Sequence, residues 1–228
     1  MSWLGQGDHW AHLSHLTTCL AMVAALIQTG EVNLTRWTAY IPCRGHYAQS
    51  KQRRVRRWLG NSRINVHRLY KLIIQAVLAE WQEAELYLSL DTSLFWDEYC
   101  LIRLAVVHRG RALPLAWRVL QHPSASVAFG DYQQMLSDAA HYLPAGIKVV
   151  LLADRGFVHR ELMSLVTKQL GWHYRIRLKS TAWIWRAHKG WHQLKDFHFA
   201  PGAVLPIRQA TQESMVWSGA FGLWPQQR

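Results

Sequence analysis

Two stretches of sequence decide the fold, LYLSLDT at 86–92 and IKVVLLADRGF at 147–157. In the first, leucines alternate with polar residues, which is the period of a β-strand with one buried face. In the second, the continuously apolar run at 149–153 is typical of a strand that is buried on both faces. Each run ends on an aspartate, so two adjacent strands would place Asp91 and Asp154 side by side.

Two carboxylates at neighbouring strand ends repel each other and need protons or cations between them. Oxygen ligands suit Mg²⁺, and metal ions held by carboxylates cleave phosphodiester bonds in many enzymes. The structural alternative is that each aspartate only opens a turn after its strand, as short polar residues often do. We therefore take Asp91 and Asp154 as the candidate catalytic and metal-binding residues, with this alternative left open.

The composition indicates a polyanionic partner and a reducing compartment. The chain has 228 residues, a formal charge of +12 and a pI near 10.1, and such a basic balance favours nucleic acid. Its three cysteines, Cys19, Cys43 and Cys100, form no CxxC pair, which argues against structural zinc. The apolar stretch at 19–27 is too short to span a bilayer and is no secretory signal. We expect a cytoplasmic, nucleoid-associated protein that does not bind membranes.

The positive charge is concentrated near the N-terminus. No acidic residue occurs between Glu31 and Glu80, whereas ten lysines and arginines do. A helix designed only for solubility mixes its charges, so this segment predicts contacts to the phosphates of double-stranded DNA. The alternative is an ordinary solvated face. The candidate DNA-binding residues are Lys51, Arg53, Arg54, Arg56, Arg57 and Arg63.

Helical periodicity dominates the first part of the chain, and we interpret residues 1–83 as a helical DNA-binding module. Helices are predicted at 8–29, 33–41, 47–59 and 66–83, with Asp8 as the cap of the first and Gly30 as its end. The third helix would turn Ala48, Val55, Trp58 and Leu59 inward and its arginines outward.

The fold class predicted for the rest is α/β. Strands are expected at 86–92, 99–108, 112–120, 147–153 and 172–178, with helices at 129–143 and 158–170. Pro114 places the third strand at a sheet edge or at a bulge. Three strands, a helix, a strand, a helix and a strand are the order of a ribonuclease H-like mixed sheet, so residues 84–180 would form such a core. Residues 181–228 would begin a β-rich insertion.

Several motifs together resemble those of a known family. DTS at 91–93, ADRGF at 153–157, YRIRLKS at 174–180 and the basic QRRVRRWLGNSRINV at 52–66 are similar to segments of the DDE transposases of IS4-like bacterial insertion sequences. The resemblance covers residues from about 40 to about 185. Of these motifs, ADRGF after an apolar strand is the more specific one, and DTS alone is weak.

The resemblance implies a two-metal enzyme that nicks transposon ends and transfers strands. Asp91 and Asp154 would be the first two acids and would hold Mg²⁺ or Mn²⁺, and Arg155 and Gly156 would shape the loop beside the metal. The partner would be the double-stranded DNA of transposon ends. Because the family usually acts on paired ends as a dimer, a homodimer is also implied.

The family's third acid has no counterpart. In its pattern Tyr-x2-Arg-x3-Glu-x6-Lys, Tyr174 and Arg177 match, but Thr181 stands at the glutamate position. Glu161 comes too early in the fold order, and Glu213 lacks helical surroundings. We therefore expect a C-terminally truncated transposase that is poorly active alone. The alternatives are a non-catalytic DNA-binding fragment that binds transposon ends or inhibits a full-length transposase, a remnant without function, and another metal nuclease of this fold.

Overall fold

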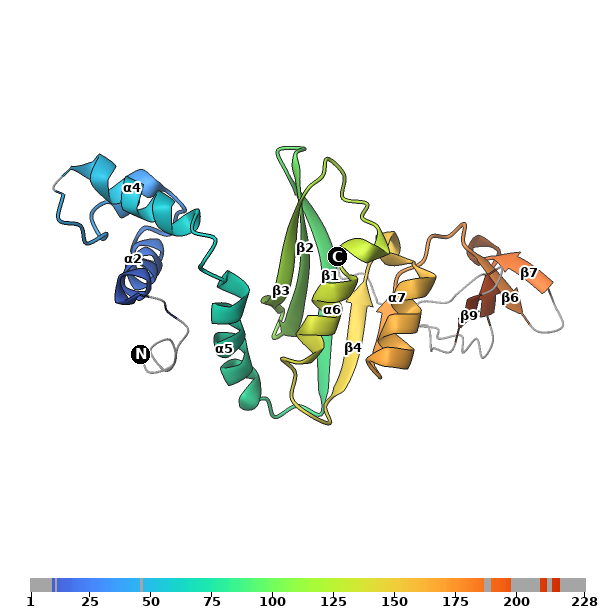
Figure 1. Ribbon diagram of the computed structural model, residues 1–228. Coiled ribbons are helices and arrows are strands. Elements are labelled where there is room, and N and C mark those ends of the chain that lie inside the picture. The colour runs from blue at the N-terminus through green and yellow to red at the C-terminus, as the bar shows by residue number, and fades with distance from the viewer. Residues whose placement is uncertain are drawn as a thin grey trace. The chain divides into compact units, whose positions relative to one another are not determined.

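A computed structural model of the chain describes residues 10, 12–45, 47–186, 190–197, 210–212 and 215–217 (Figure 1). The chain divides into two compact units, Met1–Ala79 and Glu80–Arg228. In the described residues the first unit is helical, and the second is built on a five-stranded mixed sheet, so the structure is of the α/β type. No helix in these described ranges combines the length and the apolar character that crossing a membrane requires.

The helical unit contains α2 (Leu13–Thr29), α3 (Leu34–Trp37), α4 (Ala48–Leu59) and α5 (Val66–Ala79). Gly30 ends α2 in the left-handed conformation at φ 66°, and its N–H donates to the Leu26 carbonyl, as predicted for this position. Asn33 caps α3 by accepting from the amides of Thr35 and Arg36. The predicted cap Asp8 lies outside the described residues.

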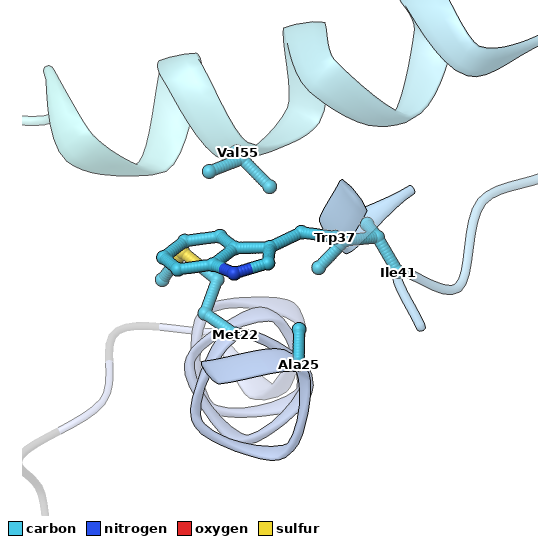
Figure 2. Packing of buried hydrophobic residues seen from close by; sticks show 5 residues of the cluster. All are labelled: Met22, Ala25, Trp37, Ile41 and Val55. Carbon is cyan, nitrogen blue, oxygen red and sulfur yellow. The ribbon is translucent and has the colours of Figure 1, made fainter. Parts of the chain in front are cut away.

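The core of the unit is formed where α2, α3 and α4 meet (Figure 2). Its buried members are Met22, Ala25, Trp37, Ile41 and Val55. Figure 2 shows the Trp37 indole between Val55 of α4 and Met22 of α2. The indole N–H donates to the Glu31 carbonyl at 2.8 Å, so this buried ring leaves no polar atom unsatisfied.

Four helix predictions need correction. The first helix, predicted at 8–29, begins at Leu13 after its N-cap His12. Leu59 and Ala48, predicted to point inward, are exposed at the two ends of α4, Leu59 over 61% of its surface. The second helix, predicted at 33–41, is the single turn of α3. The helix predicted at 66–83 stops at Ala79, because Trp81 and its neighbours lead into the first strand, where the Trp81 indole donates to the Glu85 carbonyl.

The second unit has β1 (Glu85–Phe95), β2 (Tyr99–His108), β3 (Arg111–Gln121), β4 (Lys148–Ala153) and β5 (His173–Ile176). The strand order is β3-β2-β1-β4-β5. The first three strands are antiparallel neighbours, whereas β4 is parallel to both β1 and β5. All five strands therefore occur where the sequence predicts them, and β3 is an edge strand as Pro114 requires. The register also shifts beside Pro114.

Both hairpins turn through residues with positive φ, which matches the twist of antiparallel strands. Trp96 and Asp97 connect β1 to β2 at φ 55° and 53°, and Arg109 and Gly110 connect β2 to β3 at φ 48° and 74°. The two turns lie at opposite ends of the sheet because β2 runs from one to the other.

The helices of the second unit lie on one face of the sheet (Figure 1). The helix predicted at 129–143 is in fact a 3₁₀ turn, η1 (Phe129–Asp131), followed by the shorter α6 (Gln133–Ala140). The helix predicted at 158–170 consists of α7 (Arg160–Ser164) and a π-helical turn, η3 (Leu165–Gln169). Arg118 of β3 donates to the Asp131 carbonyl at 2.8 Å and so ties this face of β3 to η1.

Beyond β5, the described residues contain two small antiparallel pairs. β6 (Trp183–Arg186) pairs with β7 (Gly190–Gln193), and β8 (Ala210–Gln212) pairs with β9 (Met215–Trp217). The β-rich insertion expected at 181–228 therefore stays a prediction, since only these short strands of it are described. Glu213 lies outside the described residues.

Candidate functional site

The candidate site is at the edge of the sheet where β1 and β4 bring their aspartates together. The parallel register between these strands runs from Glu85 and Lys148 to Leu90 and Ala153. Asp91 and Asp154 are the next residue of each strand, and Asp154 keeps an extended backbone at φ −80° and ψ −179°. Because neighbouring strands are about 4.8 Å apart, this register places the two aspartates side by side.

The two carboxylates also share one face of the sheet. Leu86, Leu88 and Leu90 are buried at 0–2% exposure, so the leucine face is the one that the helices cover. Side chains alternate between faces along a strand, so Asp91 belongs to the opposite face. Its side chain is 53% exposed. Asp154 follows Ala153, the partner of Leu90, and therefore lies on the same side as Asp91.

Local hydrogen bonds hold each carboxylate in place. One oxygen of Asp91, Oδ1, accepts from the Thr92 amide at 2.9 Å, and Thr92 Oγ1 in turn donates to the Ala125 carbonyl. Oδ1 of Asp154 accepts from the Gly156 amide at 2.8 Å. A Cβ on Gly156 would meet that oxygen at 3.0 Å, a tight contact, so a larger residue here would push the Asp154 carboxylate out of this position.

A buried aromatic group anchors the turn that carries Asp154. Phe157, which ends the turn η2 (Arg155–Phe157), is 2% exposed, and its ring packs edge-on against the ring of Tyr132 at 5.4 Å. The fully buried Tyr132 hydroxyl lies 2.7 Å from His159 Nδ1. Burial is the main cause that raises the pKa of Tyr132, and the nearby negative charges of Glu161 and Asp131 raise it further. The hydroxyl therefore keeps its proton. The ADRGF motif thus fixes its aspartate through its phenylalanine.

Arginines flank the carboxylate pair on the same face, and neither was among the predicted site residues, although Arg177 was noted as a match to the family pattern. Arg103 of β2 pairs in register with Asp91, and its Nη2 lies 3.7 Å from Asp91 Oδ2. On the other side, the Arg177 amide donates to the Ala153 carbonyl at 3.0 Å, which places Arg177 next to Asp154. The alternation of YCLIRLAVVH contained the signal for Arg103, since it puts a single charged residue on the face opposite Cys100, Ile102 and Leu104.

The donor set of this edge fits a hard divalent cation. Mg²⁺ is commonly held by one or two carboxylates, with water and substrate phosphate completing its shell, and Asp91 and Asp154 supply that number. Among the described residues there is no group of three or more acidic, histidine or cysteine side chains that could hold a metal. Glu161 instead lines a hollow of about 430 Å³ between η1, α6 and α7, together with Gln133 and Arg160.

The candidate DNA-binding residues divide into two classes. Arg53, Arg56, Arg57 and Arg63 are exposed, whereas Lys51 and Arg54 are half-buried. Arg54 bonds inside its own unit, where Nε donates to Thr18 Oγ1 at 2.9 Å and Nη1 donates to the Pro42 carbonyl.

The comparisons with known proteins found no relative. No protein-family model matches the chain, and neither a curated protein nor a solved structure is detectably similar to it.

Proposed function

We propose that the chain is a transposase-type protein of the DDE class, which binds DNA through its helical unit and acts on phosphodiesters at Asp91 and Asp154. The observation that carries this proposal is the register of β1 and β4, which sets the two carboxylates side by side on the open face of the sheet. The strand order and the parallel crossover into β4 support a ribonuclease H-like core.

The residues of the site have distinct roles in this proposal. Asp91 and Asp154 would hold Mg²⁺ or Mn²⁺, and a bound ion would supply Lewis acidity to a phosphoryl oxygen and to the attacking water. Arg103 offsets part of the negative charge of Asp91 and Asp154 when no metal is bound. Arg155, exposed directly after Asp154, presents a cation at the same sheet edge where a DNA phosphate would lie.

The helical unit would supply DNA affinity. Arg53, Arg56 and Arg57 are exposed on α4, whose Val55 is buried in the core, so three guanidinium groups project from one short helix. Lysine and arginine contacts to phosphates give binding that weakens steeply with salt. The proposed partner is therefore double-stranded DNA, including transposon ends.

A second candidate function is DNA binding without catalysis. It is favoured by the donor set, because the described residues bring two carboxylates to the site and no third acidic ligand. Such a protein would occupy transposon ends or inhibit an active transposase. A homodimer on paired ends is compatible with both candidates.

One experiment separates these candidates. The purified full chain is incubated with labelled duplexes that carry the inverted repeats flanking its gene, with and without Mn²⁺. Metal-dependent nicking that is lost in Asp91→Asn and in Asp154→Asn supports the transposase. Salt-sensitive binding without nicking supports the DNA-binding protein. Absence of binding at low salt contradicts both.

The binding arm has a matched control. The variant Arg53→Gln/Arg56→Gln/Arg57→Gln removes three positive charges from α4. Three exposed cations of the second unit serve as the control and are replaced in Arg111→Gln/Lys168→Gln/Lys195→Gln. Losing three phosphate contacts lowers the slope of log affinity against log salt by about 3, and we expect this only in the α4 variant. Equal losses in both would indicate a response to net charge alone.

A further inference from the structure

At the carboxylate edge, two negative side chains lie between two positive ones across the sheet. Reading across the strands, Trp117 of β3 pairs with Arg103 of β2, and Arg103 pairs with Asp91 of β1. Asp154 follows on the β4 side and Arg177 on the β5 side. The carboxylates therefore lie between two arginines, and one of these, Arg103, already contacts the group that would receive a metal.

The contact between Arg103 and Asp91 has the character of an exchangeable ion pair. The two side chains are 39% and 53% exposed, and the atoms Nη2 and Oδ2 are 3.7 Å apart. Exposed pairs of this kind stabilise a fold by at most about 1 kcal/mol. In contrast, the other oxygen of Asp91 is fixed by the Thr92 amide. Arg103 therefore contacts the oxygen that is less constrained, and it can leave without disturbing the strand.

We propose that Arg103 is a positioning residue that competes with the metal for Asp91. Without DNA, its guanidinium holds the Asp91 carboxylate and repels a divalent cation. When a DNA phosphate lies across the open face, the guanidinium turns to the phosphate, as arginine suits phosphate oxygens as well as carboxylates. The Asp91 oxygen is then released to the metal. This inference rests on the proposed function, since it concerns the same carboxylate pair.

The consequence is a coupling between DNA binding and metal binding. A unit positive charge a few ångströms from a bound divalent ion weakens its binding even in water, by about threefold to tenfold. Binding couplings are reciprocal, so DNA would tighten metal binding by the same factor by which metal tightens DNA binding. Because of Arg103, the protein without DNA would bind metal weakly, and the complex with DNA would bind it more tightly.

The test measures Mn²⁺ binding by the full-length protein through the loss of the free-ion paramagnetic resonance signal. Without DNA, we expect Arg103→Gln and Arg103→Met to bind Mn²⁺ about threefold to tenfold more tightly than the wild type. Arg103→Lys keeps the charge and should remain near the wild type. Arg111→Gln removes the same charge at the far end of β3 and should change nothing. Asp91→Asn should abolish the site in each background.

A second arm repeats the Mn²⁺ titration with a saturating short duplex. The duplex binds some Mn²⁺ itself, and the same titration of Asp91→Asn measures this background so that it can be subtracted. DNA phosphate can ligate Mn²⁺ in both proteins, but only the wild type has a guanidinium to release, so DNA should tighten Mn²⁺ binding by a larger factor in the wild type than in Arg103→Gln. Equal factors in the two proteins overturn the competition. Circular dichroism confirms that each variant is folded. Equal Mn²⁺ affinities in the wild type, Arg103→Gln and Arg111→Gln overturn the competition while leaving the metal site of the proposed function intact. Weaker binding in Arg103→Gln also overturns it. Absence of Asp91-dependent Mn²⁺ binding in every variant overturns the inference and the metal site together.

Discussion

The variant Arg54→Met tests whether Arg54 stabilises the helical unit, unlike the arginines of α4 that face solvent. Arg54 lies on α4 between Arg53 and Val55, and its guanidinium reaches Thr18 of α2 and the carbonyl of Pro42. Methionine keeps much of the aliphatic stem that packs in the unit but removes the charge and both donors. We expect Arg54→Met to lower stability, unlike changes at Arg53, Arg56 or Arg57.

The magnitude follows from the two hydrogen bonds. A bond to a charged group is worth about 1.5–3 kcal/mol, but Arg54 is half-buried and water replaces part of what is lost. Thr18 Oγ1 retains its own bond to the Ser14 carbonyl at 2.7 Å, and the exposed Pro42 can be solvated. The net loss is therefore about 1–2 kcal/mol. For a domain of 60–100 residues, each kcal/mol lowers the melting temperature by about 4–8 °C.

Thermal unfolding of the full chain, followed by circular dichroism at 222 nm, measures this change. The transition of the helical unit should fall by about 5–15 °C in Arg54→Met. In Arg57→Gln, the matched control from the same helix, it should stay within about 2 °C, because surface substitutions change stability little. A melting temperature unchanged in Arg54→Met, or lowered equally in Arg57→Gln, would refute the division of the basic residues into two classes.

Two further predictions concern the second unit. The Lys148 ammonium and the Tyr87 hydroxyl donate to Glu85 and lower the pKa of this carboxyl below its usual range. Their stabilising effect is therefore complete above the pKa of Glu85 in the unfolded chain and disappears as the pH falls through the lowered pKa. The unfolding free energies of the wild type and Glu85→Gln should differ near neutral pH, and the difference should shrink as the solution is acidified. Tyr132→Phe removes the buried bond to His159 and should destabilise the unit by about 1–2 kcal/mol in urea, whereas unchanged stability would show that this bond does not anchor the Asp154 turn.

The strands could be predicted because the alternation along the chain matches the burial across the sheet. The predicted bounds of β2, Tyr99–His108, are those in the structure. The helix expected at 129–143 was predicted less well. Its apolar spacing continues without interruption, but hydrogen bonds divide the segment into η1 and α6. Asp131 accepts from the Ala128 amide, and Tyr132 has φ −129° between η1 and α6. Local side-chain bonds of this kind compete with helix propagation and do not appear in hydrophobic periodicity.

The division of the basic residues was missed for a different reason. A count of positive charges does not show which arginines of α4 face inward. Their spacing along the helix does. Lys51, Arg54, Val55 and Trp58 follow the i, i+3, i+4, i+7 pattern of one face, and Val55 is buried while the Trp58 indole donates to the His15 carbonyl. Arg54 therefore belongs to the inward stripe despite its charge. Its polar partners, Thr18 and Pro42, are distant in sequence and could not be identified from the helix alone.

The placement of the candidate site is tied to the packing of the sheet. A slip of one residue in β1 would turn every side chain to the other face and would expose Leu86, Leu88 and Leu90, which are buried at 0–2%. Burying each leucine is worth about 1.5–3 kcal/mol, so the slip would cost about 5–9 kcal/mol. That loss is comparable with the whole stability of a domain, about 5–15 kcal/mol. The leucines thus fix the face on which Asp91 lies. Asp91 and Asp154 can remain side by side despite their repulsion, because the burial of the leucines on the other face of β1 sets the position of Asp91.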